Sequence, residues 1–307
     1  MIRTAALLLL TLVIIPTLAF KFGQPLDETQ VHMIKSAATI MLASAGLCFI
    51  VSEWTGNCSQ FDKLWSILPV VYAWLFAAQS GWDDRMVLMA VLASAWGIRL
   101  TYNFARRGGY SWKFWEGEED YRWEVLRRRK EFQNKWVWRL FNLFFISLYQ
   151  NTLVLLFTLP PVIAWQVKDK PLGIPDALFA GLFLLLVIIE TIADQQQWKF
   201  QTSKYRKRDS GEPMTEEEKQ GFVSSGLWSK MRHPNYAAEQ GLWICFYLLA
   251  AVASGNYVNW SIAGCILLLL LFWGSSNFSE EISAGKYPAY KAYQQRTPRF
   301  LPKLLRK

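Results

Sequence analysis

No charged side chain occurs in residues 240–279, which read QGLWICFYLLAAVASGNYVNWSIAGCILLLLLFWGSSNFS. An uncharged apolar run of about 18 residues or more is typical of a membrane-spanning helix. The triplet Ser254-Gly255-Asn256 is a turn signal within this stretch, so we expect a tight hairpin of two spans. Residues 140–167 also contain no charged side chain. These two stretches predict an all-α, polytopic bundle of transmembrane helices.

The remaining apolar runs predict about seven or eight spans in all. The expected spans lie near residues 4–20, 34–52, 64–82, 85–104, 138–164, 174–194, 236–254 and 257–275. Residues 4–20 follow a basic start and could instead be a signal peptide. The residues after Pro16 form a poor cleavage site and more spans follow, so we favour a retained first span.

The overall composition agrees with a membrane protein and excludes several other classes. Hydrophobic residues make up 52% of the 307 residues and charged residues 19%, whereas a soluble domain carries about 25% charged residues. Disordered proteins, collagen-like fibres and small disulfide-bonded scaffolds are therefore excluded. An ordinary soluble enzyme is nearly excluded as well.

The excess positive charge sets the expected orientation in the membrane. The formal net charge is +9, and basic residues concentrate in residues 105–135, 199–232 and 284–307. Two expected spans separate each basic segment from the next, so all three fall on one side, which the positive-inside rule makes cytoplasmic. We expect an integral, multi-pass protein that contacts membrane lipid, in the endoplasmic reticulum of a eukaryote or the inner membrane of a bacterium. A nucleic-acid partner is not expected.

Two further composition features bear on possible partners. Residues 106–135 are rich in Trp, Tyr and Arg, which suits a helix lying on the membrane surface. The four Cys are not spaced as C-x-x-C, and the chain has two His. We therefore expect neither a disulfide framework nor a metal site.

Several ionisable side chains fall inside or beside the expected spans, where each costs about 2.5–3.5 kcal/mol on insertion scales. Glu190 and Asp194 are four residues apart and share a helix face. They could accept hydrogen bonds from sugar hydroxyls or an amide, or they could be interfacial charges bridged to the basic loop. Arg99 could bind an anion, although snorkelling to the interface is favoured. Asp62 precedes an apolar run and could cap that helix.

The segment before the penultimate expected span is the most informative. Residues 225–236 read SGLWSKMRHPNY, and Pro234 suits the first turn of a helix whose N–H groups favour an anion. Arg232 and His233 add positive charge, while Asn235 and Glu239 share a helix face one turn apart. This pattern suits a nicotinamide nucleotide, but also any cofactor that bears a phosphate or an amino acid. The alternative is a capped helix start at the membrane interface.

The C-terminal tail holds aromatic and basic side chains that could stack on an adenine ring and pair with phosphates. An aromatic belt with snorkelling cations is the alternative. The side chains concerned are Lys286, Tyr287, Tyr290, Tyr293 and Arg296. The sequence has no Walker A motif and no G-x-G-x-x-G after a strand pattern, so a dinucleotide would have to bind within the helical bundle.

These segments resemble the steroid 5α-reductase-like membrane family. Residues 225–239 look like its signature of Gly-Leu-Trp, then Arg-His-Pro-Asn-Tyr, then Glu, and residues 62–65 resemble its Asp-x-x-Trp. Residues 96–127, 190–200 and 290–302 resemble its other blocks. The resemblance covers roughly residues 60–302 and is closest to the largely uncharacterised branch of the superfamily that also holds the isoprenylcysteine methyltransferases.

The resemblance implies an NADPH-dependent reductase of an activated carbon–carbon double bond in a lipid or steroid-like enone. Its substrate would be a lipophilic small molecule. Residues 1–60 would form N-terminal transmembrane helices, and residues 61–307 the catalytic domain. Asn235 and Glu239 would lie near the nicotinamide and the tyrosines near the adenosine. By position, the cofactor-binding residues would be Asp194, Trp228, Arg232, His233, Asn235, Tyr236, Glu239, Tyr287 and Tyr290.

The catalytic residues are less well matched than the cofactor residues. The steroid enzymes carry a Glu and a Tyr that polarise the substrate ketone, and this sequence has no clean match for either. Asp62 and Trp96 fall at roughly those places by order, and Tyr102 or Tyr149 could supply a phenol. We therefore take Asp62, Tyr102 and Tyr149 as candidates for the group that hydrogen-bonds the carbonyl oxygen as enolate charge develops.

Two other functions remain open. A membrane methyltransferase of the isoprenylcysteine type, which uses S-adenosylmethionine, shares the Arg-His-Pro start, the later Glu280-Glu281 pair and a Tyr-x-x-Tyr tail. Asn235 and the upstream blocks argue against it. A non-catalytic membrane protein is the second alternative, because a site can degenerate while its fold persists.

Overall fold

The computed structural model describes residues 9–14, 17–18, 21, 25–113 and 115–302, and this part of the chain is helical without any strand. Six helical segments within it are long and apolar enough to cross a membrane. They are α3 (Glu28–Thr55), α6 (Asp84–Ala105), the run Lys135–Val167, α11 (Ile174–Ser210), α13 (Pro234–Ser254) and α14 (Ile262–Lys286). The predicted class, an all-α polytopic bundle, is confirmed. The expected first span, residues 4–20, lies mostly outside the described residues.

The run Lys135–Val167 is built from successive segments with different helical geometry. These are α8 (Lys135–Phe141), the π-helical η3 (Asn142–Tyr149), α9 (Gln150–Thr158), α10 (Pro160–Ala164) and the 3₁₀ turn η4 (Trp165–Val167). The shorter elements are η1 (Leu10–Ile14), α4 (Gln60–Leu64), α5 (Leu68–Gln79), α7 (Tyr121–Arg127), η2 (Lys130–Phe132), α12 (Glu216–Gln220), η5 (Gly226–Ser229) and α15 (Tyr290–Arg296).

Within the expected span at residues 64–82 the structure has one short helix, α5, which a turn separates from the preceding α4. Pro69 lies in the first turn of α5, where its ring is tolerated although it would break a continuous helix. With 12 residues, α5 is about 18 Å long, which is shorter than the apolar layer of about 30 Å. By contrast, α11 has 37 residues and continues well beyond its expected end at residue 194.

The chain divides into two compact units. Unit 1 comprises residues 1–180 and 245–267, and unit 2 comprises residues 181–244 and 268–307. Helices α11, α13 and α14 each contribute residues to both units. Each unit is described by itself below.

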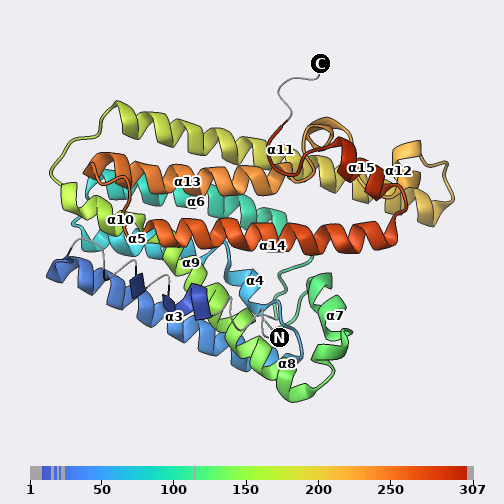
Figure 1. Ribbon diagram of the computed structural model, residues 1–307, viewed down its shortest axis with the longest axis horizontal. Helices are drawn as coiled ribbons and strands as arrows, with labels where there is room; N and C mark the ends of the chain where they lie inside the picture. Colours follow the sequence, from blue (N-terminus) through green and yellow to red (C-terminus); the bar gives the residue numbers. More distant parts are fainter. Residues whose placement is uncertain (1–8, 15–16, 19–20, 22–24, 114, 303–307) are drawn as a thin grey trace. The chain divides into compact units, whose positions relative to one another are not determined.

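In unit 1, α3 lies antiparallel beside the run Lys135–Val167 (Figure 1). Three side-chain contacts fix this register along the whole length of α3. Asn142 Nδ2 donates to Ser52 Oγ at 2.8 Å, Thr152 Oγ1 lies 3.7 Å from Met41 Sδ, and Gln30 Nε2 donates to the Val162 carbonyl at 2.7 Å. These polar contacts are spaced between apolar layers, so they select one alignment of the two segments.

Helices α5 and α6 form a hairpin in which the backbones approach closely. Gly97 on α6 makes this possible, because a Cβ at this position would lie 2.7 Å from the Ser66 carbonyl oxygen. Trp74 Nε1 donates to Ser94 Oγ at 2.9 Å across the same interface. At the other end, the buried guanidinium of Arg85 forms a bidentate pair with Asp176 and donates to backbone carbonyls of residues 167–171.

In unit 2, the first turns of α13 pack antiparallel to α11. Asn235 contacts Asp194, the ring of Trp243 meets that of Phe183 at 6.5 Å, and a Cβ at Gly241 would lie 3.0 Å from Leu186. The two helices therefore run in opposite directions, with later residues of α13 beside earlier residues of α11. This register places the polar side chains of both helices at the same level.

Candidate functional site

The guanidinium of Arg232, just before α13, is held by four hydrogen bonds. Its Nε donates to Glu280 Oε1 at 2.7 Å and its Nη2 to Glu280 Oε2 at 3.2 Å. Its Nη1 donates to the carbonyls of Gln294, at 3.0 Å, and Thr297. The guanidinium thus joins the start of α13 to α14 and to the C-terminal segment. A bidentate pair of this kind is strong and geometrically specific.

His233 is fixed through the same carboxylate. Its Nε2 lies 2.8 Å from Glu280 Oε1, and its ring stacks on Tyr236 with centroids 5.3 Å apart. The backbone N–H groups of Arg232 and His233 donate to the carbonyls of Pro298 and Arg299 at 2.8 and 3.1 Å. The expected anion site at the start of α13 therefore has several of its donors already satisfied within the chain.

Asn235 and Asp194, two of the predicted cofactor residues, are brought together. Asn235 Nδ2 donates to Asp194 Oδ1 at 3.1 Å, and Asn235 Oδ1 accepts from the Tyr236 N–H at 3.0 Å. Asp194 is buried, as are Glu190 and Glu239. The two predicted polar stripes, one on α11 and one on α13, thus lie on helices that pack against each other.

Glu239 lies one turn deeper on α13 than Asn235. Its Oε1 accepts from Trp243 Nε1 at 3.1 Å. Glu190 lies one turn from Asp194 on α11, so the antiparallel register puts the two glutamates at a similar level. Unit 2 therefore offers three carboxyl groups and one carboxamide, all among apolar side chains.

Trp228, in η5, supports this arrangement from the side. Its indole Nε1 donates to the Ala193 carbonyl at 3.1 Å, next to Asp194. Gln196 Oε1 accepts from the Leu227 N–H at 3.0 Å, and Gly226, at φ +58°, leaves the space that the Gln196 side chain occupies. The predicted role of Trp228 in cofactor binding remains a prediction, and its indole N–H has a backbone partner.

The C-terminal tyrosines pack on one another around Phe222. Tyr290 and Tyr293 are buried with it, and Tyr287 packs against this group. Tyr293 donates its hydroxyl hydrogen to the Trp228 carbonyl at 2.5 Å, and burial raises the pKa of this phenol. Lys204 donates to the Gly221 carbonyl at 2.9 Å beside the same cluster. Tyr287 and Tyr290 are therefore close neighbours in unit 2.

In unit 1, the predicted acid Asp62 lies on α4, where it is half-buried. Its Oδ2 accepts from Trp123 Nε1 at 3.2 Å. Burial raises the pKa of Asp62, and the nearby carboxylate of Asp120 raises it further. Arg122 lowers the pKa of Asp120, although burial opposes this. Asp62 is thus the member of this acid pair that retains its proton more readily.

Residues 108–113 and 115–127 fold back over α4, and we call them the strap. Backbone groups of the strap at residues 115, 116, 117 and 120 form hydrogen bonds with side chains on or just before α4. The side chains of Tyr110 and Glu119 form hydrogen bonds with backbone groups of residues 63 and 58. Lys63 is buried beneath it and donates to the Glu116 carbonyl at 2.6 Å. The expected single interfacial helix is absent from the described part of residues 106–135, where Gly108 and Gly117 adopt positive φ and α7 has seven residues.

The other two catalytic candidates occupy different environments. Tyr102, on α6, is 67% exposed, and the Arg106 guanidinium lies 5.8 Å from its ring centroid. Tyr149, at the end of η3, is 2% exposed and stacks on Phe145 with centroids 5.3 Å apart. Asp62, Tyr102 and Tyr149 all belong to unit 1, whereas all the predicted cofactor residues belong to unit 2.

Two residues were missing from the predicted site. Glu280 organises Arg232 and His233, and Lys63 is buried beside Asp62. A signal for Glu280 existed, because it is the first charged residue after the uncharged run 240–279. Lys63 gave no such signal, because a lysine in a short helix is usually exposed.

Comparisons with known proteins add a family and a relative. A family model described as a protein of unknown function, DUF1295, matches residues 48–297. The chain is similar to an uncharacterized protein of the fission yeast Schizosaccharomyces pombe, C594.04c. The two are 37% identical over 265 residues, which cover 83% of this chain and 75% of the relative. No solved structure matches.

Proposed function

We propose that this chain, which belongs to the DUF1295 family, is an integral-membrane, NADPH-dependent reductase of an activated carbon–carbon double bond in a lipid or steroid-like enone. The observation that carries the proposal is the hydrogen bond between the half-buried Asn235 and the buried Asp194, on two apolar helices next to the Arg232-His233 segment. An ionisable group such as Asp194 costs free energy in a span unless it is paired or serves a site.

The residues of unit 2 fit the amide end of a nicotinamide nucleotide. A carboxamide needs both an acceptor and a donor, and the buried Asp194 and Glu239 together with the half-buried Asn235 supply both kinds of group. The proposed cofactor, when bound, supplies the hydride. The role of the chain is to orient it and to exclude water.

The phosphate end is matched less directly by Arg232, whose guanidinium is already paired with Glu280 and two carbonyls. Arg299 is a second source of charge for a phosphate. Its Nη2 lies 3.6 Å from Glu280 Oε2 and its guanidinium 4.5 Å from the Trp273 ring centroid, but its Nη1 has no hydrogen-bond partner among the described residues. We therefore assign Arg232 to positioning α13 and Arg299 to the anionic part of the cofactor.

Asp62 is the proposed acid. Burial raises the pKa of Asp62, which favours the protonated form that would donate a hydrogen bond to the carbonyl oxygen as enolate charge develops. The proposed substrate is lipophilic, in keeping with the six apolar helices among the described residues that are long enough to span a membrane. We further propose that the basic loops and the C-terminus face the cytoplasm, at the endoplasmic reticulum in a eukaryote or the inner membrane in a bacterium.

One titration tests the proposed cofactor. The purified full-length protein is titrated with NADPH, NADH and S-adenosylmethionine, and binding is followed by calorimetry. We expect binding of NADPH, loss of that binding in Asn235→Ala and Glu239→Ala, and no change in the exposed control Gln295→Ala. Selective binding of S-adenosylmethionine would overturn the reductase, and unchanged NADPH binding in both site variants would overturn the assigned site.

A methyltransferase is the second candidate, and one observation favours it. His233 and Arg232, from the Arg-His-Pro start, both contact Glu280, from the Glu-Glu pair, so the motifs that this sequence shares with isoprenylcysteine-type enzymes meet in space. The same titration separates the candidates, because each predicts a different tight ligand. A protein that binds neither ligand supports a non-catalytic role.

A further inference from the structure

Exposed aromatic side chains gather at the C-terminal end of α3 in unit 1. We call this group the collar, and its members come from α3, the strap and the start of the run Lys135–Val167. They are Trp54, Trp112, Trp115, Tyr121 and Trp136. Trp112 is fully exposed, and Trp54 and Trp136 are 72% and 70% exposed. Few soluble surfaces leave so many large aromatic rings uncovered.

Ring contacts and hydrogen bonds connect the elements that carry the collar. The rings of Trp54 and Trp115 are 6.1 Å apart. Arg139 Nε donates to Glu53 Oε2 at 2.8 Å and its guanidinium lies 5.2 Å from the Trp136 ring centroid, which brings the start of α8 to the end of α3. Arg127 donates to the Gly56 carbonyl at 2.7 Å, which connects the strap to the C-terminal end of α3.

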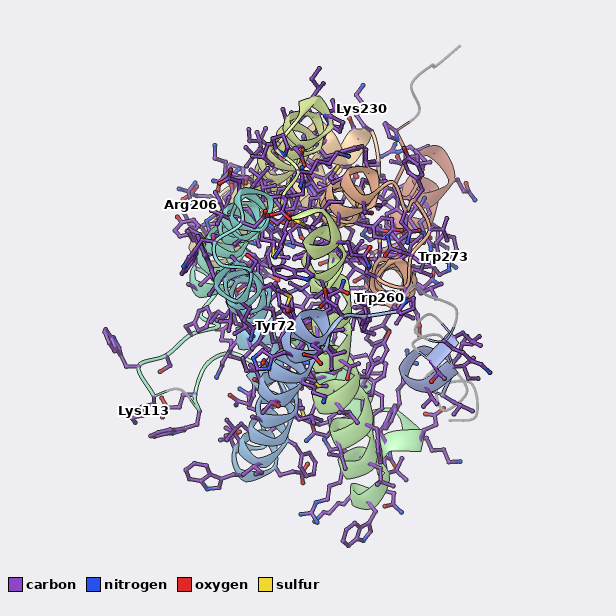
Figure 2. All side chains as sticks on the ribbon, turned by 90° about the vertical axis from the view of Figure 1, so that its left-hand side faces the viewer. Tyr72, Lys113, Arg206, Lys230, Trp260 and Trp273 are labelled. Atoms are coloured by element: carbon purple, nitrogen blue, oxygen red, sulfur yellow. The ribbon has the colours of Figure 1, made fainter. Side chains whose placement is uncertain are left out.

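Exposed cations accompany the aromatic rings. They are Lys113, Arg128, Lys130, Lys135 and Arg139. Lys113 lies on a loop that projects from the neighbouring helices (Figure 2). Lys130 and Lys135 have no acidic partner among the residues that the structure describes, and the pairs of Lys113 and Arg128 with Glu116 and Glu124 are exposed. Exposed pairs of this kind hold their partners weakly.

The position of the collar identifies its occupant. It lies where one apolar span, α3, ends and another, Lys135–Val167, begins, which is the level of the lipid headgroups for any protein that these helices anchor. Trp and Tyr prefer that level, and Lys and Arg there reach lipid phosphates. Acidic neighbours of the collar are partly neutralised, since Glu119 pairs with Arg127 and Glu53 with Arg139. The remaining charge is positive and complements an anionic headgroup.

We propose that the collar is a binding surface for anionic phospholipid headgroups. The aromatic rings lie at the glycerol level, and Arg128, Lys130 and Lys135 pair with phosphates. The bound lipids hold the strap against the membrane surface. This proposal is independent of the proposed reductase activity.

The test uses the full-length protein in nanodiscs that contain phosphatidylcholine mixed with phosphatidylglycerol. Native mass spectrometry counts the phosphatidylglycerol that remains bound after release of the protein. We expect enrichment over the input lipid ratio, and at least about a tenfold loss of affinity in the triple variant Arg128→Gln, Lys130→Gln, Lys135→Gln, because each charge near an anionic surface contributes severalfold. High salt should reduce the enrichment in the same way.

A matched control removes the same charge from exposed positions of unit 2, as Lys219→Gln, Lys230→Gln, Lys291→Gln. We expect this variant to keep the enrichment. Equal loss in both triple variants would overturn the assignment to the collar, and an unenriched wild-type protein would overturn the proposal altogether. Thermal unfolding of each variant, compared with wild type, confirms that the charge changes leave the fold intact.

Discussion

Asn235 Nδ2 on α13 lies 3.1 Å from Asp194 Oδ1 on α11, and both residues come from segments 41 positions apart in the sequence. The contact joins a carboxylate to a neutral amide donor, so the amide of Asn235 partly replaces the water that the Asp194 carboxylate lacks among apolar side chains. The stability and the proposed cofactor affinity of unit 2 should both depend on this pair.

The variant Asn235→Asp is predicted to lose NADPH binding and to destabilise the protein. The new carboxylate would face Asp194 where the amide now donates, and two carboxylates at this distance repel each other. We expect at least a tenfold increase in the dissociation constant, measured by calorimetry, together with a lower unfolding temperature. Asn256→Asp, in the turn between α13 and α14, is the control. Unchanged NADPH affinity in Asn235→Asp would contradict the prediction.

The variant Glu280→Gln should destabilise the protein strongly. It removes the charge that neutralises Arg232 and leaves that cation buried, which costs about 3–5 kcal/mol in soluble proteins. The unfolding temperature in detergent, followed by intrinsic fluorescence, is the measurement. The neighbouring exposed Glu281→Gln should change it little. Equal unfolding temperatures for the two variants would show that the Arg232–Glu280 pair does not stabilise the start of α13.

The variant Asp62→Asn should change the dependence of stability on pH. Burial raises the pKa of Asp62, so the folded protein binds more protons at this site than the unfolded chain. The contribution of Asp62 is therefore largest below the unfolded pKa of about 3.9 and decreases as the pH rises through the folded pKa. Asp120 contributes with the opposite sign, because its pKa is lowered. Unfolding temperatures measured from pH 4 upwards should decrease less steeply in Asp62→Asn, and parallel curves would contradict the assignment.

Two glycines of α14 should respond differently to the same substitution. A Cβ at Gly264 would lie 2.2 Å from the Leu156 backbone, whereas a Cβ at Gly274 meets nothing within 4 Å. Gly264→Ala should therefore cost about 1–3 kcal/mol or more through overpacking. Gly274→Ala should be neutral or slightly stabilising, since alanine favours the helix. Thermal unfolding in detergent measures both, and similar values would contradict the close approach of Gly264 to Leu156.

The sequence predicted those parts of the fold that depend on local composition. Uncharged runs such as 240–279 locate the spans because lipid excludes charge over the full length of a helix. The region 64–82 was predicted wrongly as one span, because hydropathy averages across Pro69 and does not register the helix break. The strap could not be predicted, since its bonds to α4 join residues about 50–60 positions apart.

The sequence predicted which polar residues of the site share a helix face, but not which residues of different helices contact each other. Spacing by four residues placed Glu190 with Asp194 and Asn235 with Glu239, but the antiparallel register that joins the two stripes comes from packing. Nothing in the local sequence pairs Arg232 with Glu280, 48 residues away. The roles of Tyr102 and Tyr149 remain predictions.

The backbone carbonyls of Thr297 and Pro298 accept hydrogen bonds from Arg232, just before the start of α13. A chain cut short before residue 297 would lose these acceptors and leave the Arg232 guanidinium with fewer bonds, so premature stop codons there should act as folding defects. Affinity tags and fluorescent fusions for this protein therefore belong on a spacer beyond residue 302.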